Sequence, residues 1–369
     1  VATAIKTGGP GALFWMWIAA FFGMATKYAE GLLAIKFRTL DDQGNVSGGP
    51  MYYITHGFSG KWQIIAKPLA YFFAFAGVLV AWLGIGTFSQ VNSITSSLQN
   101  SFGWSPKIVS VILALITAAI IFGGIQSISK VSEKVVPFMA GLYIIAALIV
   151  IFANFNQLLP VLEMVFQSAF TGKAAVGGFA GATVMAAMRL GIARGVFSNE
   201  SGLGSAPIAA AAAKTEEPVE QGLISMTGTF IDTIIICTLT GLAILVTGQW
   251  SGSLEGAPMT QAAFSSIFGT FGELALTLSL VLFAFTTVLG WSYYGERCFE
   301  FIFKSTKFLS FYRLIFVAMV ALGGYLTLEV VWKIADIVNG LMALPNLIAL
   351  LVLSPIILKE SKSYFERHK

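Results

Sequence analysis

The sequence predicts an all-α polytopic membrane protein, and three observations carry this prediction. Of its 369 residues, 56% are hydrophobic and 11% are charged, whereas soluble domains carry about 25% charged residues. The apolar residues form nine segments long enough to cross a bilayer as helices, which takes about 20 residues each. Lys and Arg gather in every second loop between these segments, as the positive-inside rule requires.

The nine expected segments follow one another with polar or glycine-rich loops between them. The first begins after the turn Gly8–Pro10, the second is long enough to tilt, and the fifth is interrupted by polar residues. In chain order they are about Gly11–Ile35, Pro68–Leu98, Ile108–Gly124, Val135–Ala153, Val176–Ala213, Leu223–Gly248, Leu274–Phe301, Leu314–Leu328 and Ile334–Leu358.

The basic residues orient these segments. One set of alternate loops, together with the C-terminal tail, holds most of the Lys and Arg residues, and each loop of the other set holds one. The rich set contains Lys36, Arg38, Lys61, Lys67, Lys130, Lys134, Lys214, Arg297, Lys304, Lys307, Arg313, Lys359, Lys362, Arg367 and Lys369. The poor set contains Lys6, Lys107, Lys173 and Lys333. Because basic loops stay on the cytoplasmic side, we expect a multi-pass protein of the cell membrane with a cytoplasmic C-terminus.

The sequence offers no catalytic or metal centre of a common type. Cys237 and Cys298 lie in apolar or membrane-flanking helices without metal-ligand spacing, and His56 and His368 lie in polar segments. We therefore expect neither an enzyme nor a bound cofactor. The net charge of +4 reflects membrane topology and does not indicate nucleic-acid binding.

The stretch Arg194–Pro207 interrupts the fifth segment and is the main candidate for a binding site. Irregular polar backbone at membrane depth occurs only where it is buried in protein or lines a cavity, and a glycine-interrupted segment points to a transporter site. Its freed N–H groups can bind a carboxylate, and its freed C=O groups can bind a cation. The alternative, close helix packing through small residues, explains the glycines but not the amide or the carboxylate. The substrate-binding candidates are Ser198, Asn199, Ser201 and Gly202.

Charged residues inside the expected spans are costly and mark function or structural pairing. Arg194 and Glu200 lie on either side of the interruption, so we expect them to pair and hold it in shape. Asp232 lies near the middle of the sixth segment. It can bind either a cation or a backbone group of the interruption, and we favour the backbone group, which makes it a third structural support.

Polar residues in two further segments complete the candidate site. Thr286 and Thr287 in the seventh segment can supply neutral oxygens to a sodium ion, with back-bonding to their own helix as the equal alternative. In the second segment Gln90 and Asn92 place amides at mid-membrane depth, where they bind either a substrate or another helix. Phe88 shares a helix face with Asn92, four residues later.

An interrupted fifth segment among nine suggests two sets of five spans related by inversion, with the first set lacking its own interrupted helix. A short echo supports this. Ala4–Pro10 and Ala212–Pro218 share the pattern Ala-x-Lys-Thr-x-x-Pro, and the loop charges place them on opposite sides of the membrane. We read residues 1–369 as one transporter domain, with the remainder of the first repeat at 1–153, the second repeat at 174–358 and a cytoplasmic tail at 359–369.

Six further motifs stand out in the sequence: Gly8–Trp17, Gly23–Glu30, Gly49–Tyr53, Arg194–Gly204, Phe230–Thr233 and Trp332–Asp336. With these motifs the chain resembles the alanine or glycine:cation symporter family, and it looks close to the archaeal sodium/alanine symporters. Ser201 stands where Ala is usual in the family, which is a conservative difference.

The resemblance implies a fold and a site. The fold is the five-plus-five inverted repeat of the leucine transporter class, with discontinuous helices and one further span. The first broken helix of the family, with its Gly-Asn motif just before Val1–Ile5, is expected to be largely absent from this chain. The resemblance also implies Thr286 and Thr287 as sodium ligands, and Phe88, Thr287 and Trp291 as the wall of the substrate pocket.

These observations predict a secondary symporter in which sodium influx drives uptake of a small neutral amino acid, alanine or glycine, by alternating access. The expected partners are the amino acid, sodium and the lipid bilayer. The alternatives are another small solute, proton coupling, or a membrane scaffold that does not transport. The residues leave the oligomeric state open.

Overall fold

A computed structural model of the chain describes residues 1–40, 46–123, 125–171 and 184–368. These residues form a helical bundle with one small antiparallel ladder, in which β1 (Thr39–Leu40) pairs with β2 (Val46–Ser47). The helices are α1 (Ala2–Gly8), α2 (Ala12–Lys36), α3 (Pro50–Gly57), η1 (Gly60–Trp62), α4 (Gln63–Leu83), α5 (Phe88–Phe102), α6 (Pro106–Ile121), α7 (Ile125–Ala153), α8 (Phe155–Thr171), α9 (Val184–Asn199), α10 (Ala206–Ala210), α11 (Pro218–Thr229), η2 (Phe230–Cys237), α12 (Thr238–Val246), η3 (Gln249–Ser251), α13 (Gly256–Phe303), η4 (Thr306–Phe308), α14 (Leu309–Gly323) and α15 (Leu328–Arg367).

The described residues include seven helical stretches long and apolar enough to cross a membrane, and α6 is a shorter apolar helix. Large apolar side chains cover much of the outer surface, as in Phe22, Leu115 and Leu351, which are 67%, 66% and 76% exposed. A soluble monomer rarely exposes contiguous apolar surface on this scale. The chain is therefore an all-α, multi-pass membrane protein.

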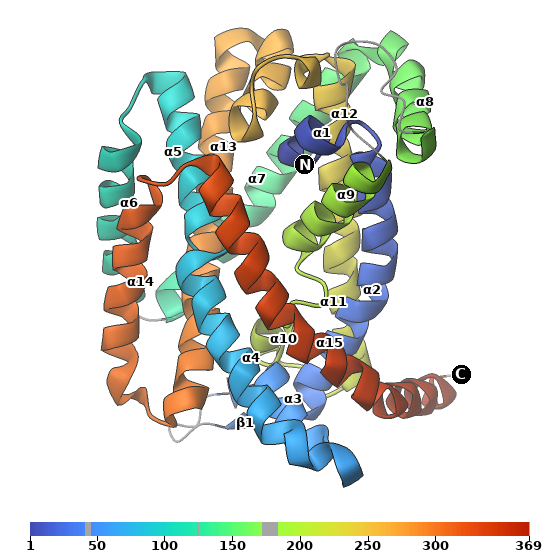
Figure 1. The fold of residues 1–369 in the computed structure, drawn as a ribbon, viewed down its shortest axis with the longest axis vertical. Coiled ribbons are helices and arrows are strands. Elements are labelled where there is room, and N and C mark those ends of the chain that lie inside the picture. Colours follow the sequence, from blue (N-terminus) through green and yellow to red (C-terminus); the bar gives the residue numbers. More distant parts are fainter. Residues whose placement is uncertain (41–45, 124, 172–183, 369) are drawn as a thin grey trace.

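The helices separate into two sides, which Figure 1 shows clearly. Helices α2, α9 and α11 pack together on one side, and α5, α6 and α14 pack on the other. The long helix α15 crosses α4 diagonally through the middle of the bundle and also contacts α2 and α5. One buried apolar cluster joins α3, α4, α13, α14 and α15, and a second joins α1, α7, α8 and α12. The space between the two sides holds the candidate site.

The second predicted span is interrupted, contrary to the expectation of one tilted helix. Helix α4 ends at Leu83 and α5 begins at Phe88. Between them the Thr87 hydroxyl donates to the carbonyl of Trp82. A Cβ added at Gly86 would lie 2.8 Å from the Cβ of Trp291, so the bend brings α13 close to the backbone. The same Cβ would lie 2.7 Å from the carbonyl oxygen of Ala81, so the glycine permits both the bend and the close approach of α13.

The fifth predicted span is interrupted where the sequence places it. Helix α9 ends at Asn199 and the short helix α10 begins at Ala206. Three residues between them have positive φ: Glu200 (57°), Gly202 (83°) and Gly204 (82°). We call residues 200–205 the break. The beginning of this predicted span, residues 176–183, lies outside the described residues.

Two other predicted spans differ from plain helices. The sixth contains η2, a π-helix that carries Asp232, and π-helical turns occur frequently at functional sites. The seventh belongs to α13, a 48-residue helix that bends at Gly269 (φ 59°).

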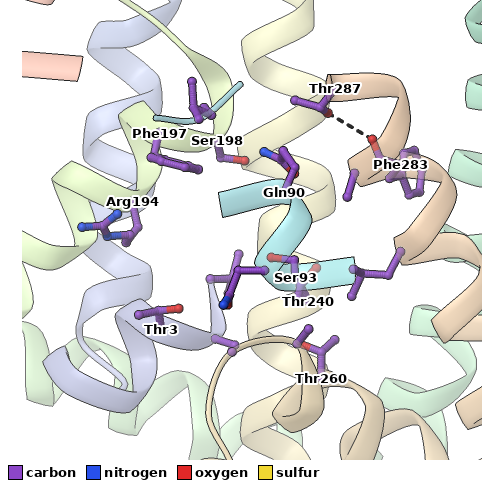
Figure 2. A pocket seen from close by; sticks show the side chains of 18 of the residues that line it. Thr3, Gln90, Ser93, Arg194, Phe197, Ser198, Thr240, Thr260, Phe283 and Thr287 are labelled. Carbon is purple, nitrogen blue, oxygen red and sulfur yellow. Dashed lines mark hydrogen bonds between the residues drawn. The ribbon is translucent and has the colours of Figure 1, made fainter. Parts of the chain in front are cut away.

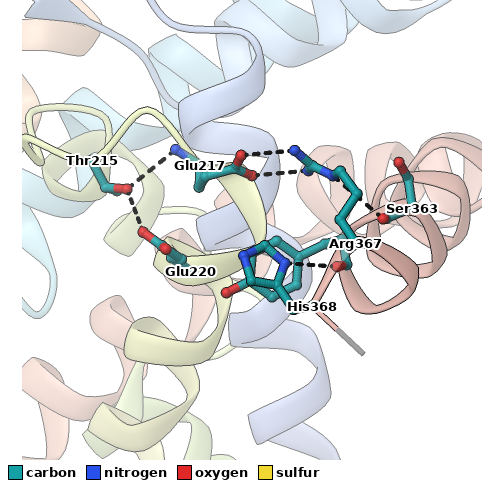
Figure 3. Close-up of polar contacts among 7 residues, drawn as sticks. Thr215, Glu217, Glu220, Ser363, Arg367 and His368 are labelled. Carbon is teal, nitrogen blue, oxygen red and sulfur yellow. Dashed lines mark hydrogen bonds and ion pairs between the residues drawn. The ribbon is translucent and has the colours of Figure 1, made fainter.

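The last predicted span was expected to end at Leu358, followed by a tail. Instead, α15 continues as one helix to Arg367. Figure 3 shows Arg367 donating to both carboxylate oxygens of Glu217, at 3.2 and 3.3 Å. Nearby, Lys36 at the end of α2 pairs with Glu360 at 2.7 Å. The end of α15 therefore joins α2 and the start of α11 at one end of the bundle.

Candidate functional site

A cavity of about 940 Å³ lies between α5, α9, α13 and the start of α15. This volume is in the range of small-molecule sites. Gln90 and Ser93 from α5, Ser198 from α9 and Thr287 from α13 all line it, and in the view of Figure 2 Gln90 lies between Ser198 and Thr287. Among the residues proposed from sequence, those that line the cavity are Gln90, Asn92, Arg194, Ser198, Glu200, Asp232, Thr286, Thr287 and Trp291.

The guanidinium of Arg194 pairs with Asp336 on α15. Its Nη2 lies 2.7 Å from Oδ1 of that carboxylate, and its Cζ lies 4.1 Å from the centre of the Trp332 ring. Only 5% of the Arg194 side chain is exposed, against 48% of Asp336. The predicted pairing of Arg194 with Glu200 is therefore wrong, because a carboxylate and an aromatic face on α15 already hold the guanidinium.

Glu200 instead ties the break to α13. Its Oε1 accepts a hydrogen bond from Trp291 Nε1 at 2.9 Å, and its Oε2 accepts one from the Ser205 hydroxyl at 2.6 Å. The backbone of Glu200 is left-handed, a conformation that costs a non-glycine residue about 1–3 kcal/mol and persists only where surrounding contacts determine it. Glu200 thus supports the break, through partners that the sequence did not indicate.

Asp232 meets the end of α9 through side chains. Its Oδ1 accepts from the Ser198 hydroxyl at 3.0 Å and its Oδ2 from the Thr233 hydroxyl at 2.7 Å. The expected contact with a backbone group of the break is wrong in this detail, because a side-chain hydroxyl makes the contact. The π-helix places this carboxylate on the cavity wall.

Within the interrupted stretch, three proposed substrate-binding residues do not line the cavity. Asn199 donates to the Thr233 hydroxyl at 2.9 Å and accepts from the backbone N–H of Ser201 at 2.9 Å. The Ser201 hydroxyl lies 3.2 Å from that of Thr229. The Gly202 carbonyl accepts from Asn346 on α15 at 3.0 Å. These contacts place the three residues in the scaffold of the break.

Thr286 and Thr287 both line the cavity and both bond back to their own helix. Their hydroxyls donate to the carbonyl of Phe283 at 2.9 and 3.0 Å, and Figure 2 shows the second of these bonds. A donating hydroxyl keeps its oxygen lone pairs. The arrangement therefore leaves two neutral oxygens on the cavity wall that can accept a cation.

The polar face of α5 supplies the opposite wall. Asn92 lines the cavity and donates to the carbonyl of Leu326 at 3.2 Å. Ser93 and Ser96 line it as well. Phe88 is 5% exposed and packs in the protein without lining the cavity. The serines were missed, although the spacing of Asn92, Ser93 and Ser96 on one helix face was a readable signal.

Comparison with known proteins identifies the family. The profile of the sodium:alanine symporter family matches residues 1–369. The chain belongs to this family. It is 52% identical over 371 residues to an uncharacterized transporter of Haemophilus influenzae, covering 100% of this chain and 80% of that protein. It is 49% identical over 375 residues to the sodium/alanine symporter AgcS of Methanococcus maripaludis, with the same coverage.

A further relative carries a different substrate in its name. The chain is 40% identical over 372 residues to the probable sodium/glutamine symporter GlnT of Bacillus subtilis, covering 100% of this chain and 75% of that protein. Bacterial and archaeal relatives are similarly close, so the predicted closeness to archaeal members does not single them out. The family is one of transporters, and the chain is accordingly an amino-acid:cation symporter and not an enzyme.

Proposed function

We propose that this protein couples sodium influx to uptake of a small neutral amino acid, alanine or glycine, by alternating access in the cell membrane. The observation that carries the proposal is the cavity at the break, where Ser198, Thr286, Thr287 and the α5 amides meet. These neutral groups, together with the charged side chains of Arg194, Glu200 and Asp232, line a space of the size that holds a small ligand. The relative named as a sodium/alanine symporter, 49% identical over 375 residues, supports the same substrate.

Sodium coupling rests on the two threonine oxygens. Hard monovalent and divalent cations prefer oxygen ligands, and Thr286 and Thr287 offer two of them on one wall. A proton-coupled carrier instead needs a titratable group that is free to change its charge. Of the carboxylates in this wall, Glu200 accepts hydrogen bonds from Trp291 and Ser205, and Asp232 accepts them from Ser198 and Thr233. Hydrogen bonds donated to a carboxylate favour its charged form, which supports sodium at the threonine oxygens over a proton at these carboxylates.

Selectivity for small side chains rests on the aromatic wall. Trp291, Tyr294, Phe283 and Trp332 all line the cavity, and Trp291 is held by its hydrogen bond to Glu200. A fixed indole ring limits the length of side chain that the cavity accepts. The relative named for glutamine shows why the cargo needs testing.

The architecture we propose is the five-plus-five inverted repeat of the leucine transporter class, with repeats at 1–153 and 174–358. The interrupted helix α9–α10 supports it, since such helices form the midplane sites of these carriers. The alternation of basic loops supports a cytoplasmic C-terminus, which follows α15.

The test is uptake by the full-length protein in proteoliposomes. Labelled alanine is supplied with an inward sodium gradient, and sodium is replaced by choline at fixed pH. Uptake that depends on sodium and is competed by glycine supports the proposal. Equal uptake in choline, driven by a pH gradient, supports the proton-coupled alternative. Competition by glutamine alone overturns the proposed cargo.

A further inference from the structure

Side chains from two other helices, α2 and α15, form hydrogen bonds with the backbone of the break. Glu30 on α2 accepts a hydrogen bond from the backbone N–H of Gly204 at 3.1 Å. Asn346 on α15 donates to the backbone carbonyl of Gly202 at 3.0 Å. Both side chains are fully buried, with no exposed surface. The two free backbone groups that glycine geometry creates are thereby satisfied within the protein.

The two clamping side chains also hold each other. The same Nδ2 of Asn346 lies 2.7 Å from Oε1 of Glu30, so one amide nitrogen bridges the carboxylate and the Gly202 carbonyl. The Tyr53 hydroxyl on α3 donates to Oδ1 of Asn346, which fixes which end of the amide faces the break. The cluster therefore joins α2, α3, α15 and the break.

The glycines of the break are needed for this contact. A Cβ added at Gly204 would lie 2.6 Å from Pro50 Cγ and 3.0 Å from Asn346 Cγ. The left-handed backbone there disfavours any side chain. Close backbone approach lets the buried carboxyl and amide groups reach main-chain atoms directly.

We propose that Glu30 and Asn346 are positioning residues, which set the geometry of the cavity wall by fixing the backbone of Gly202 and Gly204. The inference rests on the proposed function, because the wall they position is that of the amino-acid site. Glu200, two residues before Gly202, holds Trp291, so a displaced break moves a residue that lines the cavity. Neither positioning residue lines the cavity itself.

Because Glu30 acts by accepting hydrogen bonds, two substitutions at this position should differ in their effect. Glu30→Gln keeps an acceptor oxygen for the Gly204 N–H and for Asn346. Its new amide nitrogen replaces Oε2, which is buried without a hydrogen-bond partner among the described residues. Glu30→Leu removes the acceptor. We expect the glutamine variant to behave as wild type and the leucine variant to lose the contact.

The first measurement is hydrogen exchange of the full-length protein, read by mass spectrometry on peptides that cover residues 198–206. Losing a buried hydrogen bond speeds exchange of the freed amide roughly 10-fold or more. We expect this for the Gly204 amide in Glu30→Leu but not in Glu30→Gln. Asn346→Leu frees the Gly202 carbonyl and removes the amide that orients Glu30, so we expect a smaller acceleration there. Asn339→Leu is the matched control, because Asn339 is also buried on α15, two turns earlier.

The second measurement is alanine uptake, which reads the consequence for the site. We expect Glu30→Leu and Asn346→Leu to raise the KM for alanine roughly 10-fold with a smaller change in maximal rate, and Asn339→Leu to leave both unchanged. Tyr53→Phe removes only the hydroxyl that binds Asn346, so it is the variant to test if the leucine variants fail to fold. Its expected result is faster exchange over residues 198–206 with an intact fold.

Wild-type exchange in all variants overturns the proposal, as does equal loss in Glu30→Gln and Glu30→Leu, which assigns the effect to charge. The exchange result does not depend on the cargo. A wild-type protein that transports no alanine refutes the proposed function, and the exchange comparison still decides whether the two side chains hold the break.

Discussion

Replacing Trp291 is the sharpest test of the cavity wall. The indole is 1% exposed, lines the cavity and donates to Glu200 at 2.9 Å. Trp291→Ala removes both the ring and the hydrogen bond, whereas Trp291→Phe keeps an aromatic wall and removes only the N–H. The two variants therefore separate the steric contribution from the polar one.

The magnitudes follow from these contacts. One methylene in an apolar pocket changes discrimination by about 10–200-fold, so Trp291→Ala should improve binding of methionine relative to alanine by at least about 10-fold. Loss of a hydrogen bond to a charged group is worth about 1.5–3 kcal/mol. Because this bond joins two protein side chains, at 1.4 kcal/mol per tenfold its loss sets an upper limit of roughly 10- to 100-fold on the rise in the KM for alanine in Trp291→Phe, which should not admit methionine.

The assay is competition of labelled alanine uptake by glycine, leucine and methionine in proteoliposomes. Thermal unfolding of each variant is measured first, because truncation of a buried Trp costs about 3–5 kcal/mol. An unchanged competition profile in a folded Trp291→Ala variant refutes the assignment of this residue to the selectivity wall.

Three further predictions address other parts of the site. The double variant Thr286→Val and Thr287→Val should weaken sodium activation of uptake at least 10-fold, because it removes the hydroxyl oxygens and keeps the shape of the side chains. Ser at both positions keeps the hydroxyls and should keep the activation. Undiminished sodium activation in the valine variant removes both residues from the ion site. Asp336→Asn should lower the free energy of unfolding by about 1–3 kcal/mol, because it leaves the buried Arg194 guanidinium without its counter-charge. The loss stays at this size because Asp336 itself is half exposed. An unchanged thermal midpoint would show that this ion pair contributes nothing to stability. Gly204→Ala should destabilise the protein by at least about 1 kcal/mol, because the added Cβ lies 2.6–3.0 Å from neighbouring atoms and the backbone there is left-handed. An unaltered thermal midpoint would contradict the geometry of the break.

Much of the fold could be predicted from the sequence because membrane-spanning helices are long runs of apolar residues. The apolar runs located the helices, and the glycines and polar residues of 198–205 located the break. The interruption at Gly84–Thr87 was missed. Gly86 packs closely there against Trp291 on α13, a residue far away in the sequence.

Only part of the cavity lining was predictable from the sequence, and the side-chain partners were not, since Phe88, Asn199, Ser201 and Gly202 lie outside it. The sequence placed Thr287, Ser198 and Gln90 in one site, and all three line the cavity. Arg194 found its partner on α15, 142 residues away, where local spacing had suggested Glu200. Long-range pairings of this kind depend on which helices pack together, and one sequence does not determine that.

The buried carboxylate of Glu30 shows the same limit. The motif that contains it was visible, yet nothing in its spacing indicated that it accepts from the backbone of Gly204. A charged residue inside a span signals an important contact, but only the fold reveals whether that contact is a ligand, a counter-charge or a neighbouring backbone.

The measurement that tests the central claim most directly is sodium-dependent thermal stabilisation of the full-length protein by a panel of small amino acids. A ligand at 100 times its Kd stabilises the folded state by about 2.7 kcal/mol. We predict that alanine or glycine raises the unfolding temperature in sodium and not in choline, and that larger amino acids have little effect. Equal stabilisation in both salts, or none by any small neutral amino acid, would contradict sodium-coupled binding at this cavity.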